Sequence, residues 1–258
     1  MNSMRRPLIA GNWKMNFGGP EAITLAGGIA KASKELSAVD VVVCPPFTAL
    51  AAVAAELDGT RVGLGAQNVH PKASGAFTGE VASAMLVAAG CTWVIVGHSE
   101  RRQFFGDTDA FVADKTSAAF AARLAPIVCV GETEAEREAG NTLAIIERQL
   151  NAVLPVLVAH KGEAMAIAYE PVWAIGTGKA ATAADAEDAH AFIRKLLTSA
   201  SEDLAARVRV LYGGSVTGAN ARELLACPNV DGALVGGASL TLEKFEPILG
   251  AAQALTLS

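Results

Sequence analysis

Apolar residues occur in eight short runs along the whole chain, and more polar or Ala-rich segments separate them. The starts of these runs lie 21 to 43 residues apart, which leaves room each time for a helix and two short loops. Most runs are continuously apolar instead of alternating, as expected for parallel strands that are covered on both faces. The predicted strands are 8–10, 41–44, 62–66, 93–96, 127–130, 165–169, 208–212 and 233–235.

The segments between these strands are predicted to be amphipathic or Ala-rich helices, and no linker or low-complexity stretch interrupts them. Eight β/α units with right-handed crossovers favour closure into a (β/α)8 barrel over an open doubly wound sheet, which usually has fewer strands. We therefore predict one α/β barrel domain over residues 1–258, with a two-domain Rossmann-like arrangement as the alternative. The predicted helices include 20–36, 107–124, 133–154 and 182–200.

One stretch without charge, 81–99, approaches the length that could span a bilayer. Gly90 divides it into a helix-like half and a β-rich half, so we predict a helix, a turn and a buried strand there. The apolar residues at 7–10 are too few for the core of a secretory signal, and export is not expected.

Composition narrows the classes of partner. With 52% hydrophobic and 18% charged residues, the chain is expected to fold as a globule. The formal net charge of -5 argues against a general nucleic-acid or anionic-membrane partner. The four cysteines lie far apart without a C-x-x-C pair, which favours reduced thiols in the cytoplasm over a disulfide framework or a zinc site.

Polar side chains follow several of the predicted strands at the point where each strand ends. In a β/α barrel the loops after the strands form the face that carries the active site. Residues far apart along the chain are therefore expected to converge on one mouth. They are Asn12 and Lys14 after the first strand, His98 and Glu100 after the fourth, Glu170 after the sixth, Ser215 after the seventh, and Gly236 and Gly237 after the eighth.

His98 precedes Ser99 and Glu100, which are predicted to be a helix cap and first turn. A helix N-terminus disfavours the imidazolium form, so a neutral His98 is expected to donate its N–H to a carbonyl that is becoming an enolate. A merely structural, hydrogen-bonded histidine is the alternative. The other histidines, His70, His160 and His190, lack this setting and are predicted to lie at the surface or in loops.

Glu170 ends an apolar run and is followed by Pro171, so its carboxylate is expected to be poorly solvated and more basic than usual, as a general base for carbon acids requires. Glu100 is explained by the helix dipole, and it could also orient a neighbour. Lys14 would place a positive charge beside an anionic ligand, although a solvated surface lysine is an equal alternative. Asn12 either donates to a substrate oxygen or closes the turn.

Glycine pairs after the last two strands match the place where such barrels bind phosphate with bare backbone N–H groups. The segment 172–181 begins after a proline and contains two glycines, as a hinged lid would, although an ordinary loop is the alternative. Lys179 within it is not a Walker lysine, because Ala180 stands where Ser or Thr is required, so ATP is not implied. The 213–218 segment also lacks the G-x-S-x-G spacing of serine hydrolases.

Five of these segments together resemble the triosephosphate isomerase family, in the family's order and over essentially the whole chain. They are GNWKMN at 11–16, GHSERR at 97–102, AYEPVWAIGTG at 168–178, YGGSV at 212–216 and LVGGA at 234–238.

The resemblance implies that dihydroxyacetone phosphate and glyceraldehyde 3-phosphate are interconverted through an enediolate without metal or organic cofactor. Glu170 would move the carbon-bound proton, His98 would polarise the oxygens, and Lys14 and Asn12 would stabilise developing charge, with Glu100 in support. The phosphate would lie against Gly176, Ser215, Gly236 and Gly237, beneath a lid that carries Trp173.

The segment 67–80, which begins at Gln67 and ends at Glu80, resembles the family loop that inserts into a neighbouring subunit. The resemblance implies a homodimer with Thr78 near the other chain's active site, and a mobile surface loop is the alternative. Ala180 departs from the family, where a polar residue often occurs, and this puts the motion of the lid in doubt.

Two other functions remain open from the sequence. A lyase or aldolase on the same fold would need a Schiff-base lysine inside the barrel or a metal cluster, and neither is evident. A non-catalytic sugar-phosphate-binding barrel is the other, because fold alone does not determine activity.

Overall fold

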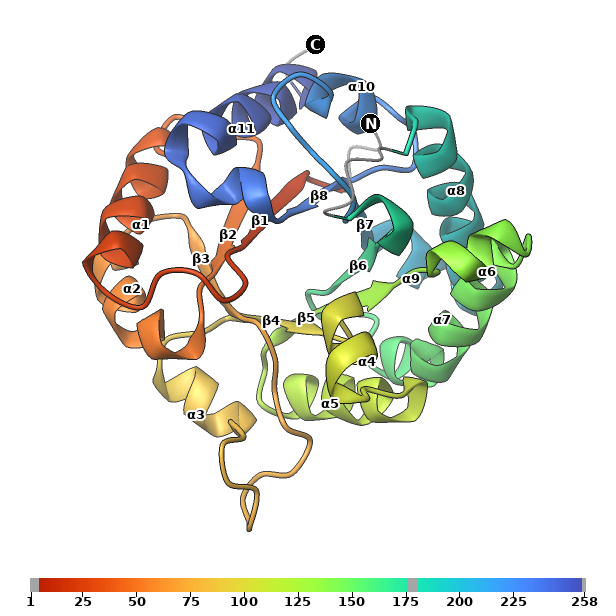
Figure 1. Cartoon of the computed structure of the whole chain (residues 1–258), viewed down its shortest axis with the longest axis horizontal. Coiled ribbons are helices and arrows are strands. Elements are labelled where there is room, and N and C mark those ends of the chain that lie inside the picture. The colour runs from red at the N-terminus through yellow and green to blue at the C-terminus, as the bar shows by residue number, and fades with distance from the viewer. Residues whose placement is uncertain (1–4, 176–180, 257–258) are drawn as a thin grey trace.

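A computed structural model describes residues 5–175 and 181–256, which form a closed barrel of eight parallel strands (Figure 1). The strands pair in chain order, and the ring closes where the first strand pairs with the last in the register Leu8↔Gly232. The strands are β1 (Leu8–Asn12), β2 (Asp40–Cys44), β3 (Gly63–Ala66), β4 (Trp93–Val96), β5 (Ala125–Val130), β6 (Ala166–Tyr169), β7 (Arg209–Tyr212) and β8 (Gly232–Val235).

Helices surround this ring of strands (Figure 1). The α-helices are α1 (Pro20–Ala32), α2 (Leu50–Leu57), α3 (Ser83–Ala88), α4 (Ser99–Phe105), α5 (Asp109–Ala121), α6 (Glu134–Glu138), α7 (Thr142–Ala159), α8 (Ala183–Ala200), α9 (Glu202–Arg207), α10 (Ala221–Leu225) and α11 (Leu242–Thr256). Short 3-10 helices occur at η1 (Phe47–Ala49), η2 (Val172–Ala174) and η3 (Gly237–Leu240).

The apolar core has two layers because successive side chains of each strand point to opposite faces. In β1, Leu8 and Ala10 belong to a cluster that also includes Val42, Ile95 and Ile127 from other strands. Ile9, between Leu8 and Ala10, belongs to the larger cluster that strands and helices form together. Both faces of the sheet are therefore buried, which explains why the strands are continuously apolar in sequence.

The predicted (β/α)8 barrel is confirmed, and each predicted strand agrees with the observed one to within two residues at either end. The predicted helix 133–154 is wrong as a single element. It is divided into α6 and α7, because Gly140 adopts a left-handed backbone conformation with φ of 73° after the first of them. The predicted helix 20–36 ends earlier, at Ala32.

Two segments resemble membrane spans in composition. The predicted helix, turn and strand within 81–99 are confirmed as α3, Gly90 with φ of 89°, and β4. Among the described residues, one helix, α7, is long and apolar enough to cross a bilayer. Four of its side chains, Ile146, Leu150, Val153 and Leu157, are nevertheless fully buried in the barrel core, and core helices often pass the same test of length and composition.

His190 lies in the core, and the prediction that it is a surface or loop residue is wrong. It belongs to the inner face of α8, together with Ala186 and Ile193. Its ring lies edge-on to Tyr169, and its Nδ1 atom is 3.2 Å from the carbonyl oxygen of Asn229. Burial lowers the pKa of His190 to about 3, so the imidazole is neutral in the folded protein.

This buried imidazole predicts a pH dependence of stability. Between about pH 6.5 and about pH 3 the unfolded chain binds a proton at His190 and the folded chain does not, so stability falls as the pH falls. The free energy of unfolding should decrease by up to about 1.4 kcal/mol per pH unit more in the wild type than in His190→Gln. Urea denaturation of both proteins at several pH values in this window measures the difference, and parallel slopes would contradict it.

Candidate active site

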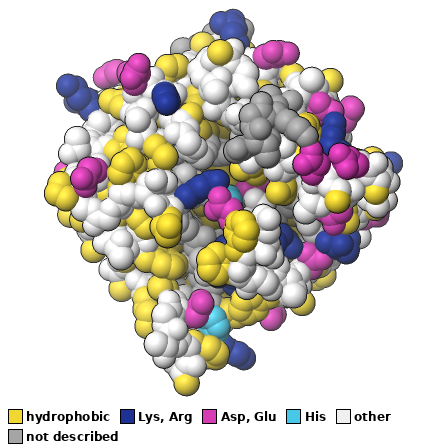
Figure 2. Space-filling model, viewed as in Figure 1, with side chains coloured by type: hydrophobic (Ala, Val, Ile, Leu, Met, Phe, Trp, Pro, Cys, Tyr) yellow, Lys and Arg dark blue, Asp and Glu magenta, His cyan; other side chains and the backbone are white. Residues whose placement is uncertain are grey.

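The polar residues that follow the strands lie around one cavity at the mouth of the barrel, of about 590 Å³. Its lining includes Asn12, Lys14, His98 and Glu170. Figure 2 shows acidic, basic and histidine side chains together at the centre of this face, where the surface is hollowed. The closed sheet thus brings together residues that are far apart in the sequence, such as Asn12 and Glu170, which are 158 positions apart.

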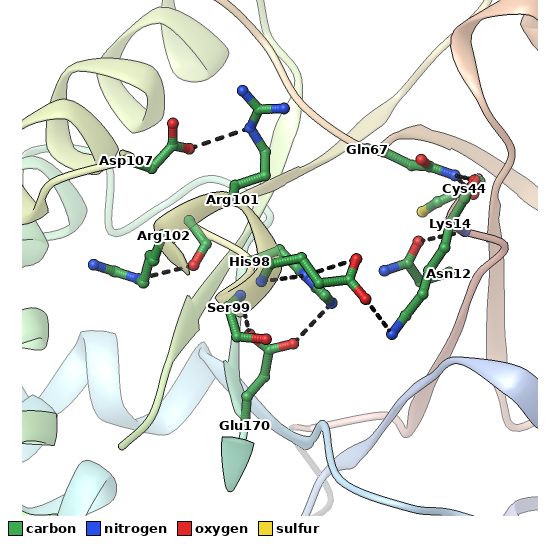
Figure 3. Close-up of polar contacts among 12 residues, drawn as sticks. Asn12, Lys14, Cys44, Gln67, His98, Ser99, Arg101, Arg102, Asp107 and Glu170 are labelled. Atoms are coloured by element: carbon green, nitrogen blue, oxygen red, sulfur yellow. Dashed lines mark hydrogen bonds and ion pairs between the residues drawn. The ribbon is translucent and has the colours of Figure 1, made fainter. Parts of the chain in front are cut away.

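Glu170 and His98 form the innermost polar contact of the site (Figure 3). The Nε2 atom of His98 is 3.0 Å from Oε1 of Glu170, and the backbone N–H of Ser99 donates to Oε2 at 2.8 Å. Both side chains are buried, with 6% of His98 and 2% of Glu170 exposed. Both oxygens of the carboxylate are therefore hydrogen-bonded in this conformation.

The hydrogen bond at the other ring nitrogen determines the tautomer of His98. Its Nδ1 atom accepts a hydrogen bond from the backbone N–H of Glu100, at 3.2 Å, so the ring proton of the neutral form is on Nε2. His98 is itself the N-cap of α4, and Ser99, the predicted cap, is the first residue of the helix. This arrangement directs an N–H donor from Nε2 toward Glu170.

The charges of His98 and Glu170 are strongly coupled. Burial lowers the pKa of His98, but the charge of Glu170 and the hydrogen bond to it raise the pKa more, so that the net direction is upward. Burial raises the pKa of Glu170, but His98, the N–H of Ser99 and Lys14 together lower it more. The predicted gain in basicity of Glu170 is therefore wrong for this conformation, because the charge of His98 and the hydrogen bonds to the carboxylate outweigh its desolvation.

Lys14 reaches the cavity from the loop after β1. Its Nζ atom lies 2.7 Å from Oε1 of Glu100, so the predicted supporting carboxylate binds the predicted cation directly. The backbone of Lys14 is left-handed, with φ of 51°, and its N–H donates to Oδ1 of Asn12 at 3.0 Å. Asn12 thus closes the turn, as one of its two interpretations predicted.

Gln67 was predicted only as the start of the long loop, yet it supports the site. Its Nε2 atom donates to the backbone oxygens of Lys14 and Cys44, both at 2.8 Å. Gln67, at the start of the 67–80 loop, therefore holds the turn that carries Lys14 (Figure 3). The 67–80 loop projects from the barrel (Figure 1). Thr78, within this loop, is exposed and does not line the cavity of its own chain.

The predicted phosphate-binding residues after β7 and β8 line the same cavity as Lys14. They are Ser215, Gly236 and Gly237. The Cβ position of Gly236 lies 3.4 Å from Cε of Lys14, so the turn after β8 is in van der Waals range of the lysine side chain. Gly176, the fourth predicted residue, lies outside the described residues, as do Lys179 and Ala180.

Glu132 is a buried carboxylate that sequence reasoning missed. It accepts hydrogen bonds from the hydroxyl of Tyr169 at 3.2 Å and from Nε1 of Trp173 at 2.9 Å. The guanidinium of Arg137 lies 4.1 Å from the ring centroid of Trp173. Burial raises the pKa of Glu132 despite these donors. The beginning of the 172–181 segment is therefore anchored to the loop after β5, and the only sequence signal was a polar residue at a strand end.

A second cleft, of about 780 Å³, borders the site between α4 and the loops after β5 and β6. Ser99, Phe104 and Trp173 contribute to its lining, and Glu170 lines both this cleft and the mouth cavity. Glu170 therefore contributes to the walls of both cavities. Among the described residues, no group of three or more His, Cys, Asp or Glu side chains is arranged to bind a metal ion.

Comparison with known proteins assigns this arrangement to a family. The family model for triosephosphate isomerase matches residues 7–252. The chain belongs to the triosephosphate isomerase family. Relatives of that name include those of Endomicrobium trichonymphae, 50% identical over 95% of this chain and 98% of the relative, and of Herpetosiphon aurantiacus, 53% identical over 94% and 97%. The crystal structure of triosephosphate isomerase from Bartonella henselae is similar with a TM-score of 0.87 and 40% identity, covering 95% of this chain and 98% of that one.

Gly131 directly follows β5, and it is a second residue of the site that sequence reasoning missed. An added Cβ would overlap the backbone oxygen of Glu170, so Gly131→Ala must displace the strand end that carries this carboxylate. We expect isomerase activity to fall at least about tenfold, because small displacements of a reacting group are costly. Gly162→Ala is the matched control, since no atom lies within 4 Å of its Cβ position. Equal activity of the two folded variants would contradict the prediction.

Proposed function

We propose that this chain interconverts dihydroxyacetone phosphate and D-glyceraldehyde 3-phosphate by proton transfer through an enediolate. The observation that carries the proposal is the pairing of the Glu170 carboxylate with the Nε2–H of His98 across the mouth cavity. A carboxylate base and a neutral N–H donor are the two groups needed to remove a proton beside a carbonyl and to stabilise the resulting oxyanion.

Glu170 takes the proton from the carbon next to the carbonyl and returns it to the neighbouring carbon. In the structure its two oxygens are hydrogen-bonded to His98 and to the N–H of Ser99. A substrate that enters between Glu170 and His98 replaces these hydrogen bonds while the carboxylate stays buried. Its pKa then rises, because the desolvation that opposed its charge remains and the compensating contacts are lost.

His98 donates its Nε2–H to the two substrate oxygens in turn as negative charge moves between them. The Glu100 N–H holds the acceptor at Nδ1 and so favours the neutral ring. Lys14, with Asn12, supplies positive charge and a donor near the developing enediolate. The ammonium of Lys14 exchanges part of its contact with Glu100 for contact with the substrate.

The phosphate lies against the backbone N–H groups of Ser215, Gly236 and Gly237, with Gly176 as the further predicted contact. Anchoring the phosphate and excluding water would suppress its loss from the enediolate. Closure of the 172–181 segment over the site remains a prediction, supported by the anchoring of Trp173 to Glu132 at its beginning.

The alternative of a Schiff-base lyase has little support in the barrel interior. Among the described residues, Lys115 is the only buried lysine. The buried Lys115 lies on α5 instead, where its Nζ atom binds Oδ2 of Asp107 and Oδ1 of Asn68. A non-catalytic sugar-phosphate-binding protein is the second alternative, and an activity assay distinguishes it.

We also propose that two copies of the chain form a homodimer through the 67–80 loop, which would bring Thr78 near the active site of the partner. Large apolar side chains near this loop and the site are exposed, including 96% of Met15, 43% of Phe77 and 67% of Phe104. Exposed apolar side chains of this size are typical of an interface.

We also propose that the protein is located in the cytoplasm, because its four cysteines, Cys44, Cys91, Cys129 and Cys227, are free thiols. We propose further that residues 1–258 form one barrel domain.

Glu170→Gln tests the proton-transfer assignment. The amide keeps the shape of the side chain but is not a base, so kcat should fall by about 10²- to 10⁴-fold in a coupled isomerase assay. The protein should come from a host that lacks its own isomerase. Glu138→Gln, at the exposed end of α6, removes the same charge outside the cavity and should retain activity. Equal activity of Glu170→Gln and wild type would end the assignment.

Thr78→Arg tests the dimer. A bulky charged side chain at the tip of the inserted loop should shift the protein toward monomers and lower activity at least about tenfold, because the monomer lacks the partner's loop. Analytical ultracentrifugation and the isomerase assay measure the two effects. Ser199→Arg, on the exposed face of α8, is the control. A wild-type protein that is monomeric and fully active would contradict the proposal.

A further inference from the structure

Among the described residues, Lys14 and Lys244 are the only Lys or Arg residues that line the mouth cavity. Lys14 is 2.7 Å from the carboxylate of Glu100, so much of its charge is already balanced. Lys244 is exposed, and it has no ion pair or hydrogen bond to any other described side chain. The cavity therefore contains one cation that the catalytic machinery does not use.

The charge balance of the mouth depends on this lysine. Lys14 is bound to Glu100, and Glu170 lies against His98, whose pKa it raises, so the charges of the catalytic groups are paired with one another. The protein as a whole also carries a formal net charge of -5. Without Lys244, a phosphate dianion that approaches the mouth would meet the repulsion of the whole molecule, and no described cation of the lining would be free of a carboxylate partner.

Lys244 is placed beside the predicted phosphate site by the local fold. It is the third residue of α11, which begins at Leu242, and one residue separates this helix from η3, which begins at Gly237. The next residue, Phe245, is fully buried and fixes the first turn of α11 against the barrel. The Cα atom of Lys244 is therefore held at the rim, while its flexible stem leaves the ammonium in water above the cavity.

We propose that Lys244 is an anion-steering residue, which attracts the phosphate of the substrate into the mouth and delivers it to the backbone of Gly236 and Gly237. The inference rests on the proposed function, because it takes the substrate to be a phosphate dianion. Lys244 acts on capture of the substrate and not on proton transfer, since the reacting groups are Glu170 and His98. Its contribution is electrostatic, so it depends on charge and on ionic strength.

The test compares Lys244→Gln, Lys244→Glu and Lys244→Arg with wild type in the full-length chain. At low salt, Lys244→Gln should lower kcat/KM about threefold to tenfold through KM, while kcat changes less than about twofold. Lys244→Glu should lower kcat/KM further, and Lys244→Arg should restore it. The difference between Lys244→Gln and wild type should shrink between about 10 mM and 200 mM salt.

Lys161→Gln is the matched control. This exposed lysine lies between α7 and β6, at the end of the barrel opposite to the mouth, and its loss changes the net charge by the same amount. It should leave KM and kcat unchanged. An equal rise of KM in Lys161→Gln would overturn the proposal, since the effect would then come from net charge alone. A Lys244→Gln protein with wild-type KM, or a Lys244→Arg protein as weak as Lys244→Gln, would also overturn it.

Binding of inorganic phosphate separates this inference from the proposed function. Isothermal titration calorimetry should show a dissociation constant about threefold or more higher in Lys244→Gln than in wild type. Phosphate binding requires no isomerisation, so a wild type that binds phosphate but does not isomerise contradicts the proposed function alone. Equal phosphate affinity in the two proteins, or no phosphate binding by wild type, contradicts the role of Lys244.

Discussion

The pairing of β1 with β8 is the constraint on which the rest of the molecule depends, because it turns eight strands into a ring. Gly232 lies at this seam with φ of 146°, and an added Cβ would overlap the backbone oxygen of Leu8, so only glycine permits the close approach. Closure brings the loop after β1 beside the turn after β8, where Gly236 lies against Lys14. Because the strands are parallel, the carboxyl ends of all eight lie at the same mouth of the barrel.

Helix α4 connects most of the groups around that mouth. Its N-terminal N–H groups bind the carboxylate of Glu170 and the ring of His98, and the Glu100 side chain binds Lys14 (Figure 3). Arg102, one turn later, donates to the backbone oxygen of Gly97, just after β4, and to that of Cys129, near the end of β5. One short helix thus sets the positions of a carboxylate, an imidazole and an ammonium group that come from three different strands.

The pKa values of His98 and Glu170 depend on the contact between the two side chains. Burial disfavours charge on both His98 and Glu170, and each is charged or polarised mainly through the other. In the proposed reaction, a substrate that separated the pair would remove contacts that lower the pKa of Glu170, while its burial would remain. The two side chains would thus satisfy each other when in contact and become reactive once the proposed substrate lay between them.

The sequence by itself determined the eight strands, the barrel and the strand ends where Asn12, Lys14, His98 and Glu170 lie, because hydrophobic periodicity and turn chemistry act between neighbours along the chain. It also carried the five motifs by which the family was predicted. The tertiary structure alone decided that His98 caps α4, that His190 is buried, that Glu132 holds Trp173, that Gly131 makes room for Glu170, and that the pKa of Glu170 is lowered. These properties depend on distances between residues from different strands and helices, and such distances exist only once the ring has closed.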